Sequence, residues 1–216
     1  MIGYLVLAIV ALKRAGIVAA SKATHVTLGD LHQPPVVLAA IGFFGAPYIH
    51  LMPSIVDTFF AGGSGTVGFL MSGAGLGALS AALFLSLQRG SSMQLRLVTI
   101  APVILAVAVA VFAVSRSLVL SFIALVFIGA SMMLSANSTN VLMQTSVPDS
   151  LRGRTIGLYA MAFQGTAPLG HLTAGAMGAR FGLTTTLLFN AACIGLVALV
   201  MRRRLAANPG ALSRIG

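Results

Sequence analysis

The sequence predicts an all-α membrane protein, a bundle of six transmembrane helices, and three observations support this fold class. Hydrophobic residues make up 58% of the 216 positions. Charged residues make up only 7%, whereas a soluble domain carries roughly a quarter. The apolar runs are also continuous and lack the alternation typical of membrane β-strands, so helices are favoured over a barrel.

Six runs reach or approach the roughly 20 apolar residues that a helix needs to cross a bilayer. In chain order they cover residues 36–56, 65–87, 97–114, 117–143, 155–179 and 181–201. The first span begins after two prolines, and the last one ends at a run of three arginines. We therefore expect one six-helix bundle over residues 36–201.

The segments outside this bundle have different compositions. Residues 1–14 are apolar and end in Lys13 and Arg14, the reverse of a secretory signal, and we interpret them as the tail of a truncated transmembrane helix. Residues 15–35 are polar and contain two prolines, as expected of a cytoplasmic linker. Residues 202–216 form a basic tail.

The distribution of positive charge predicts the orientation of the bundle. If Lys13 and Arg14 are cytoplasmic and the spans alternate, eleven of the 13 Lys and Arg residues are cytoplasmic, and only Arg116 and Arg180 lie outside. Short loops rich in Lys and Arg stay in the cytoplasm. The sequence thus predicts a multi-pass protein of the inner membrane with a cytoplasmic C-terminus.

The same features argue against other function classes. The net charge of +10 is spread between apolar runs and is not gathered on one face, so nucleic acid is not an expected partner. Cys193 is the single cysteine and cannot form an internal disulfide. No metal-ligand spacing, phosphate-binding loop or catalytic triad pattern is present. We therefore predict neither an enzyme nor a bound metal or cofactor, and expect membrane lipid as one partner.

A faint internal repeat relates the two halves of the bundle. Residues 68–79 and 157–172 both begin with Gly, are dense in small residues, and end in a Leu-Gly-X-Leu step. With three spans in each half, this pattern predicts a three-plus-three inverted repeat. Gly73 and Gly77 are also spaced for close helix packing.

Polar side chains within spans are costly and therefore mark candidate functional positions. At 100° per residue, one stripe on the fourth span contains Met133, Asn137, Asn140 and Gln144. We interpret this stripe as part of a transport pathway. The alternative is interhelical hydrogen bonding without contact to a ligand.

Two other spans carry aligned sets of this kind. One face of the first span carries Phe43, Pro47, His50, Ser54 and Asp57, which suits an amphipathic organic substrate, although Asp57 alone fits a marker of the helix end. One face of the fifth span carries Gln164, Pro168, His171 and Gly175. Both histidines titrate near neutral pH, which allows a role in proton coupling; the alternative is a buried, neutral, hydrogen-bonded state. From all three spans, the candidate pathway residues are Phe43, His50, Ser54, Asn137, Asn140, Gln144, Gln164 and His171.

Two stretches resemble the major facilitator superfamily, in the branch of the enterobactin exporter and the macrolide-efflux permeases. The run "VPDSLRGRTIGLYAMAFQGTAPLGHLTAG" is similar to that branch between and within spans ten and eleven. The run "PPVVLAAIGFFGAPYIHLMPSI" is similar to its seventh span. The resemblance extends from about Gln33 to Met201 and implies the C-terminal six-span half of a twelve-span fold.

The resemblance also implies a role for the polar connection before the fifth span. There Asp149 can pair with Arg152 one helical turn later, and Arg154 follows. In the family such a loop latches neighbouring helices when the inner side is closed, so Asp149, Arg152 and Arg154 are expected to form a cytoplasmic latch. The alternative is a positively charged anchor that only sets topology.

The function that follows is the C-terminal half of a secondary active transporter, an efflux permease for amphipathic small organic molecules. Proton coupling and alternating access are implied by the resemblance. One six-span bundle supplies half of the wall around a central site, so we expect as partner an N-terminal six-span half or a second copy. The alternative is a non-transporting membrane fragment of a disrupted or internally started transporter gene.

Overall fold

The computed structural model of the chain describes residues 38–88, 91–145 and 149–207, and it confirms an all-α bundle of the membrane type. The helices are η1 (Ile41–Gly45), α5 (Tyr48–Phe60), α6 (Ser64–Leu87), α7 (Ser91–Val114), α8 (Leu118–Thr145), α9 (Asp149–Phe163), α10 (Ala167–Phe181) and α11 (Leu183–Ala207). The predicted helix tail at residues 1–14 and the linker at 15–35 lie outside the described residues.

Five segments of the described chain are long and apolar enough to cross a membrane. They are Leu38–Phe60, Ser64–Leu87, Met93–Val114, Leu118–Thr145 and Leu183–Arg203. The helix at the predicted span 97–114 is α7, which begins earlier than predicted, at Ser91. Likewise, α11 continues to Ala207, so the first part of the predicted tail is helical.

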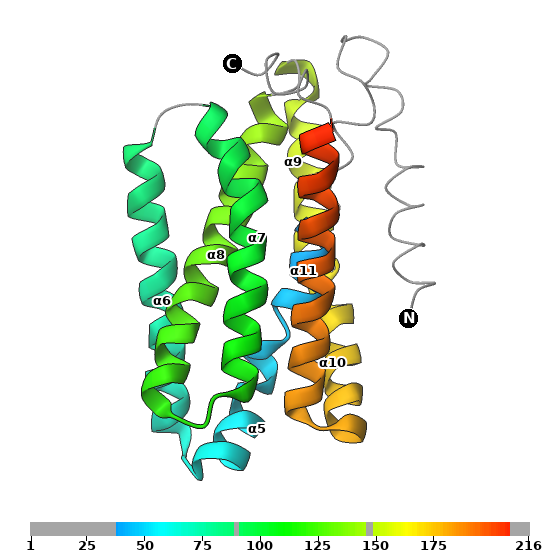
Figure 1. Cartoon of the computed structure of the whole chain (residues 1–216). Coiled ribbons are helices and arrows are strands. Elements are labelled where there is room, and N and C mark those ends of the chain that lie inside the picture. Colours follow the sequence, from blue (N-terminus) through cyan, green and yellow to red (C-terminus); the bar gives the residue numbers. More distant parts are fainter. Residues whose placement is uncertain (1–37, 89–90, 146–148, 208–216) are drawn as a thin grey trace.

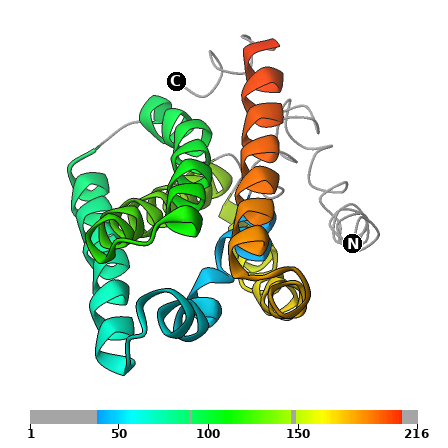
Figure 2. The same ribbon diagram turned by 60° about the horizontal axis from the view of Figure 1, so that its bottom comes forward.

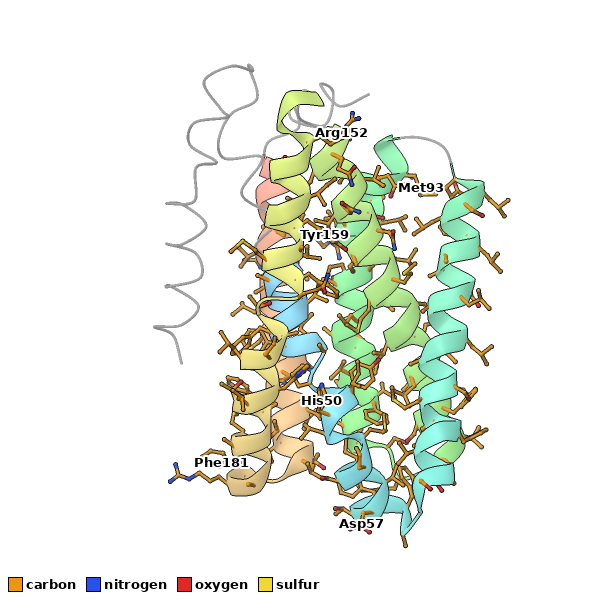
Figure 3. All side chains as sticks on the ribbon, turned by 180° about the vertical axis from the view of Figure 1, so that it is seen from behind. His50, Asp57, Met93, Arg152, Tyr159 and Phe181 are labelled. Carbon is orange, nitrogen blue, oxygen red and sulfur yellow. The ribbon has the colours of Figure 1, made fainter. Side chains whose placement is uncertain are left out.

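The helices form two layers. The helices α7 and α11 pack along each other and lie in front of the others in Figure 1 and behind them in Figure 3. The other layer contains α6, α8, η1 with α5, and α9 with α10. In Figure 2, α6, α7 and α8 form one group and η1, α10 and α11 form another, with α5 reaching between them.

The first helix of each predicted triplet packs against the helices of the other triplet. The helix α8 opens the second predicted triplet but packs against α6 and α7 of the first, and η1 opens the first triplet but packs against α10 and α11 of the second. The contacts α6 to α8 and α10 to η1 are therefore equivalent under the predicted repeat. This pattern is the one expected of a three-plus-three inverted repeat.

The positive charges of the described residues lie mainly at one end of the bundle. Arg152 and Met93 mark this end in Figure 3, and Asp57 and Phe181 mark the other. The end with Arg152 also carries the start of α7, with Arg96, and the end of α11, with its arginines. Arg116 and Arg180 belong to the opposite end, as the sequence predicted, because they lie where α7 and α10 finish.

From Leu38 onward, where the structure describes it, the first predicted span is helical but is not a regular α-helix. The chain forms the π-helix η1, turns at Ala46 and Pro47, and then forms α5, which continues four residues past the predicted end at Val56. Pro47 has no N–H to donate to the carbonyl of Phe43, four residues earlier, so a regular helix cannot pass through this point. Ala61 then ends α5 in the left-handed conformation, with φ of 47°.

The prediction of one continuous helix over residues 155–179 was wrong. The chain instead forms α9 and α10, which are 15 residues each and follow one another along the bundle around a turn at Gln164–Thr166. Pro168 lies in the first turn of α10, where proline is favoured, and it removes the N–H that would bond the Gln164 carbonyl. The Thr166 hydroxyl instead donates to the carbonyl of Ala162 at 2.7 Å and lies 3.2 Å from that of Ala39 in the neighbouring span.

Glycines bring the backbones of α6 and α8 into direct contact. A Cβ atom added to Gly77 would overlap the carbonyl oxygen of Val126, and one added to Gly129 would overlap that of Ala74. The contacts are reciprocal, since each helix offers a glycine to the backbone of the other. Gly73, one turn from Gly77, approaches Phe122 in the same way. The predicted packing role of Gly73 and Gly77 is confirmed.

A second reciprocal crossing joins η1 to the broken span. A Cβ atom added to Gly170 would overlap the carbonyl oxygen of Phe43, and one added to Gly42 would overlap the carbonyl oxygen of Phe163. Gly170 holds the glycine position of the Leu-Gly-X-Leu step at 169–172, and Gly77 holds it in the step at 76–79. The faint sequence repeat therefore marks the two equivalent helix crossings.

These crossings can be tested with alanine substitutions. We expect Gly77→Ala or Gly170→Ala to destabilise the bundle by about 1–3 kcal/mol, because the added methyl group forces the backbones apart. Matched controls are Gly75→Ala and Gly175→Ala on the same helices, where a Cβ meets no atom within 4 Å. The controls are expected to keep or slightly raise stability, since Ala favours a helix by about 1 kcal/mol over Gly.

The measurement is the thermal unfolding midpoint of the purified chain in detergent. Equal midpoints for Gly77→Ala and Gly75→Ala would show that close backbone contact does not hold α6 against α8.

Candidate functional site

The predicted polar stripe lies on α8, in the half nearer to Arg152. The amide of Asn137 donates to the carbonyl of Met133 at 3.3 Å, and that of Gln144 donates to Asn140 Oδ1 at 2.6 Å. Asn137, Asn140 and Gln144 are all half-buried. The hydroxyl residues of the same helix, by contrast, are buried at Ser131, Ser135, Ser138 and Thr139. The stripe is therefore the polar side of α8 that the bundle does not cover.

The two histidines of the spans meet between α5 and α10. The ring centroids of His50 and His171 are 3.9 Å apart, with an angle of 55° between the rings. His50 is exposed, and His171 is half-buried. The Nε2 atom of His171 is buried and has no hydrogen-bond partner within the described part of the chain. The histidines therefore form one joint polar site.

A groove continues from the histidine pair toward the end with Asp57. It has a volume of about 600 Å³ and lies between α5, α10 and α11. Its polar wall includes Ser54 and Thr58 on α5 and Thr184 on α11, and Gly175 and Gly178 of α10 leave room opposite. Ser54 follows His50 by about one helical turn, so the predicted face of α5 leads from the histidine pair into the groove.

Arg116 closes the bundle at the same end. Its guanidinium lies 3.8 Å from the centre of the Phe59 ring, donates to the carbonyl of Ser115 at 2.9 Å, and donates to the Thr184 hydroxyl at 3.1 Å. These contacts join α5, the α7–α8 connection and α11. Arg116 was expected only as one of two outer cations, and its role as a tie was not predicted.

The structure does not bring all of the predicted pathway residues together. Phe43 is half-buried in η1 and packs edge-on against Phe44, with ring centroids 4.8 Å apart. Pro47, predicted on the same face as His50, is buried. Gln164 is exposed in the turn between α9 and α10, so the helical register that aligned it with His171 does not exist. The π-helix and the break are the physical reasons for both corrections.

The predicted latch is described only in part. Asp149 begins α9, and both arginines belong to its first two turns, so the polar connection extends the helix. The Arg152 side chain is exposed at the end of the bundle. The side chains of Asp149 and Arg154 lie outside the described atoms. The latch stays a prediction.

The contact between the histidines could have been found in the sequence. Each histidine follows a proline by three residues, in Pro47-Tyr-Ile-His50 and in Pro168-Leu-Gly-His171. Each proline lies where the second helix of a broken span begins, so each histidine lies within the first five residues of that helix. The Pro-X-X-His pattern occurs in both spans and indicates the contact, whereas the spacing of residues within a single span does not.

Comparison with protein families decides the family. The model of the family described as transmembrane secretion effector, a family of the major facilitator type, matches residues 18–210. The chain belongs to this family. The family finding supports a transporter and, with the apolar helices, a multi-pass membrane protein. Comparisons with curated proteins and with solved structures gave no match.

The histidine contact predicts a specific cross-link. In a Cys193→Ser background, cysteines at positions 50 and 171 should be joined by a short bifunctional thiol reagent, because the native rings lie 3.9 Å apart. The control combines His50→Cys with Leu172→Cys, since Leu172 follows His171 directly and is 72% exposed. Mass spectrometry of the linked peptides gives the yield. Equal yields for the two pairs would contradict the placement of α5 against α10.

Proposed function

We propose that the chain forms one wall of the pathway of a secondary active transporter that exports amphipathic organic molecules. The observation that carries this proposal is the layer of α5, α8 and α10 with polar groups left uncovered at membrane depth. Uncovered amides and imidazoles would be costly against lipid, so this layer faces water or substrate. Apolar residues surround them, which suits a substrate that is partly apolar and partly polar.

The histidine pair is the proposed site of proton coupling in this wall. Imidazole changes charge near neutral pH, and two imidazoles in contact repel when both are protonated. The pair would therefore take up and release one proton while the substrate moves. Asp57 lies two turns further along the same face of α5 and is the one acidic residue whose side chain the structure describes.

The pathway needs a second wall. The described helices leave the amides of α8 half-buried and His50 of α5 exposed, and alternating access moves one bundle against another around a central site. The proposed partner is an N-terminal six-span half or a second copy of this chain. The transported molecule would then lie between the two bundles.

The proposed orientation follows the charges. Arg96, Arg152 and the arginines that end α11 share one end of the bundle, and short positive segments remain in the cytoplasm. The proposal is therefore a cytoplasmic C-terminus, with the groove near Asp57 on the outer side, in a protein of the inner membrane. Asp149, Arg152 and Arg154 would then lie at the inner mouth, where the proposed latch can act.

The double variant His50→Gln with His171→Gln tests coupling. In inverted membrane vesicles containing the full chain with its partner half, we expect proton-driven ethidium uptake to fall about tenfold or more, because glutamine cannot carry the proton. Downhill ethidium exchange should persist. Ser80→Ala is the matched control, since the Ser80 hydroxyl only bonds Leu76 within α6.

Three outcomes are informative. Unchanged proton-driven uptake in the double variant would remove the histidine pair from coupling. Loss of exchange as well as of driven uptake would place the histidines in substrate binding and not in proton transfer. Absence of ethidium transport by the unmodified chain with every candidate partner, itself included, would contradict the proposed function.

A further inference from the structure

A second cavity lies at the end of the bundle that carries Arg152. It has a volume of about 430 Å³, is partly open, and is lined by residues from the end of α6, the start of α7 and the end of α8. Met93, beside Gln94, marks its level in Figure 3. Its polar lining consists of Gln88, Gln94, Asn137 and Thr145. Of these residues, Asn137 was a predicted pathway residue, whereas Gln88, Gln94 and Thr145 lie outside the predicted spans.

Gln94 is the unusual member of this lining. Its side chain is 8% exposed, and its Oε1 atom is fully buried without a hydrogen-bond partner in the described residues. An amide oxygen buried in this way is costly, because it loses its bonds to water and gains none. The cost is removed when a donor enters the cavity.

The neighbouring polar groups do not supply that donor. The amide of Asn137 donates to Met133, and the hydroxyl of Thr145 donates to the carbonyl of Val141 at 2.9 Å. A single water molecule occupies roughly 30 Å³, so the cavity is more than ten times larger than one water needs. Its volume lies within the roughly 300–1,000 Å³ typical of small-molecule sites.

We propose that this cavity binds a small amphipathic molecule bearing an O–H or N–H group, which donates to Gln94 Oε1. Leu85 and Val141 contact the apolar part of that molecule. None of the described lining residues is acidic or basic, so recognition depends on a hydrogen bond and not on charge pairing. The site differs from the histidine pair in position and in chemistry, and binding to it does not require transport.

The test compares two probes of nearly equal shape. 1-Naphthol carries an O–H donor, and 1-methoxynaphthalene replaces it with a methyl ether. Saturation-transfer NMR on the full chain in detergent measures the binding of each probe. We expect the unmodified chain to prefer 1-naphthol by about fivefold, the typical effect of one neutral hydrogen bond. Gln94→Leu and Gln94→Met should abolish the preference and remain folded, because both bury a side chain of similar volume without an unpaired oxygen.

Ser86→Ala is the matched control, since the Ser86 hydroxyl bonds the Leu83 carbonyl at the same end of α6 and does not line the cavity, and it should keep the preference. Equal binding of the two probes by the unmodified chain would overturn the proposal. Loss of the preference in Ser86→Ala but not in Gln94→Leu would place the probe outside the cavity and overturn it as well. If neither variant at position 94 folds, the amide serves packing and the proposal fails, while the proposed transport function is unaffected.

Discussion

The rest of the structure depends on direct backbone contact between helices at two glycine crossings. Lipid tails are as apolar as leucine side chains, so helices in a membrane gain little from apolar burial and associate instead through close packing. At Gly77 with Gly129, and at Gly42 with Gly170, the two backbones come closer than any side chain would allow. These contacts hold α6 to α8 and η1 to α10, and they position the other helices of each group.

The second crossing also explains why the broken spans meet. Pro47 and Pro168 each interrupt a span, and each interruption lies beside the glycine of the partner span. At each proline the span starts a new helix that carries a histidine within its first five residues. Two breaks at the same depth therefore bring His50 and His171 together, although 121 residues separate them in the sequence. The second glycine crossing therefore accounts for the packing of the two broken spans and for the contact between their histidines.

Much of this architecture could be predicted from the sequence, because hydropathy depends on each residue's own chemistry. Span positions, the segregation of arginines and the stripe on α8 all follow from such local properties. The breaks were not predicted. Residues 155–179 were treated as one continuous helix, and this error aligned Gln164 with His171. Gln94 was missed for a different reason: it precedes the predicted start of its span at Leu97 and becomes buried only through packing between three helices.

The central claim is that the polar side chains of α5, α8 and α10 face water or substrate, while exposed apolar residues of α7 and α11 face lipid. The most direct measurement is labelling of single cysteines by a membrane-impermeant maleimide in a Cys193→Ser background. The account predicts labelling at positions 50, 137 and 140. It predicts none at Val107 on α7 and Leu196 on α11, although these are 59% and 64% exposed. Equal labelling of both sets, or labelling at Val107 and Leu196 alone, would contradict the account.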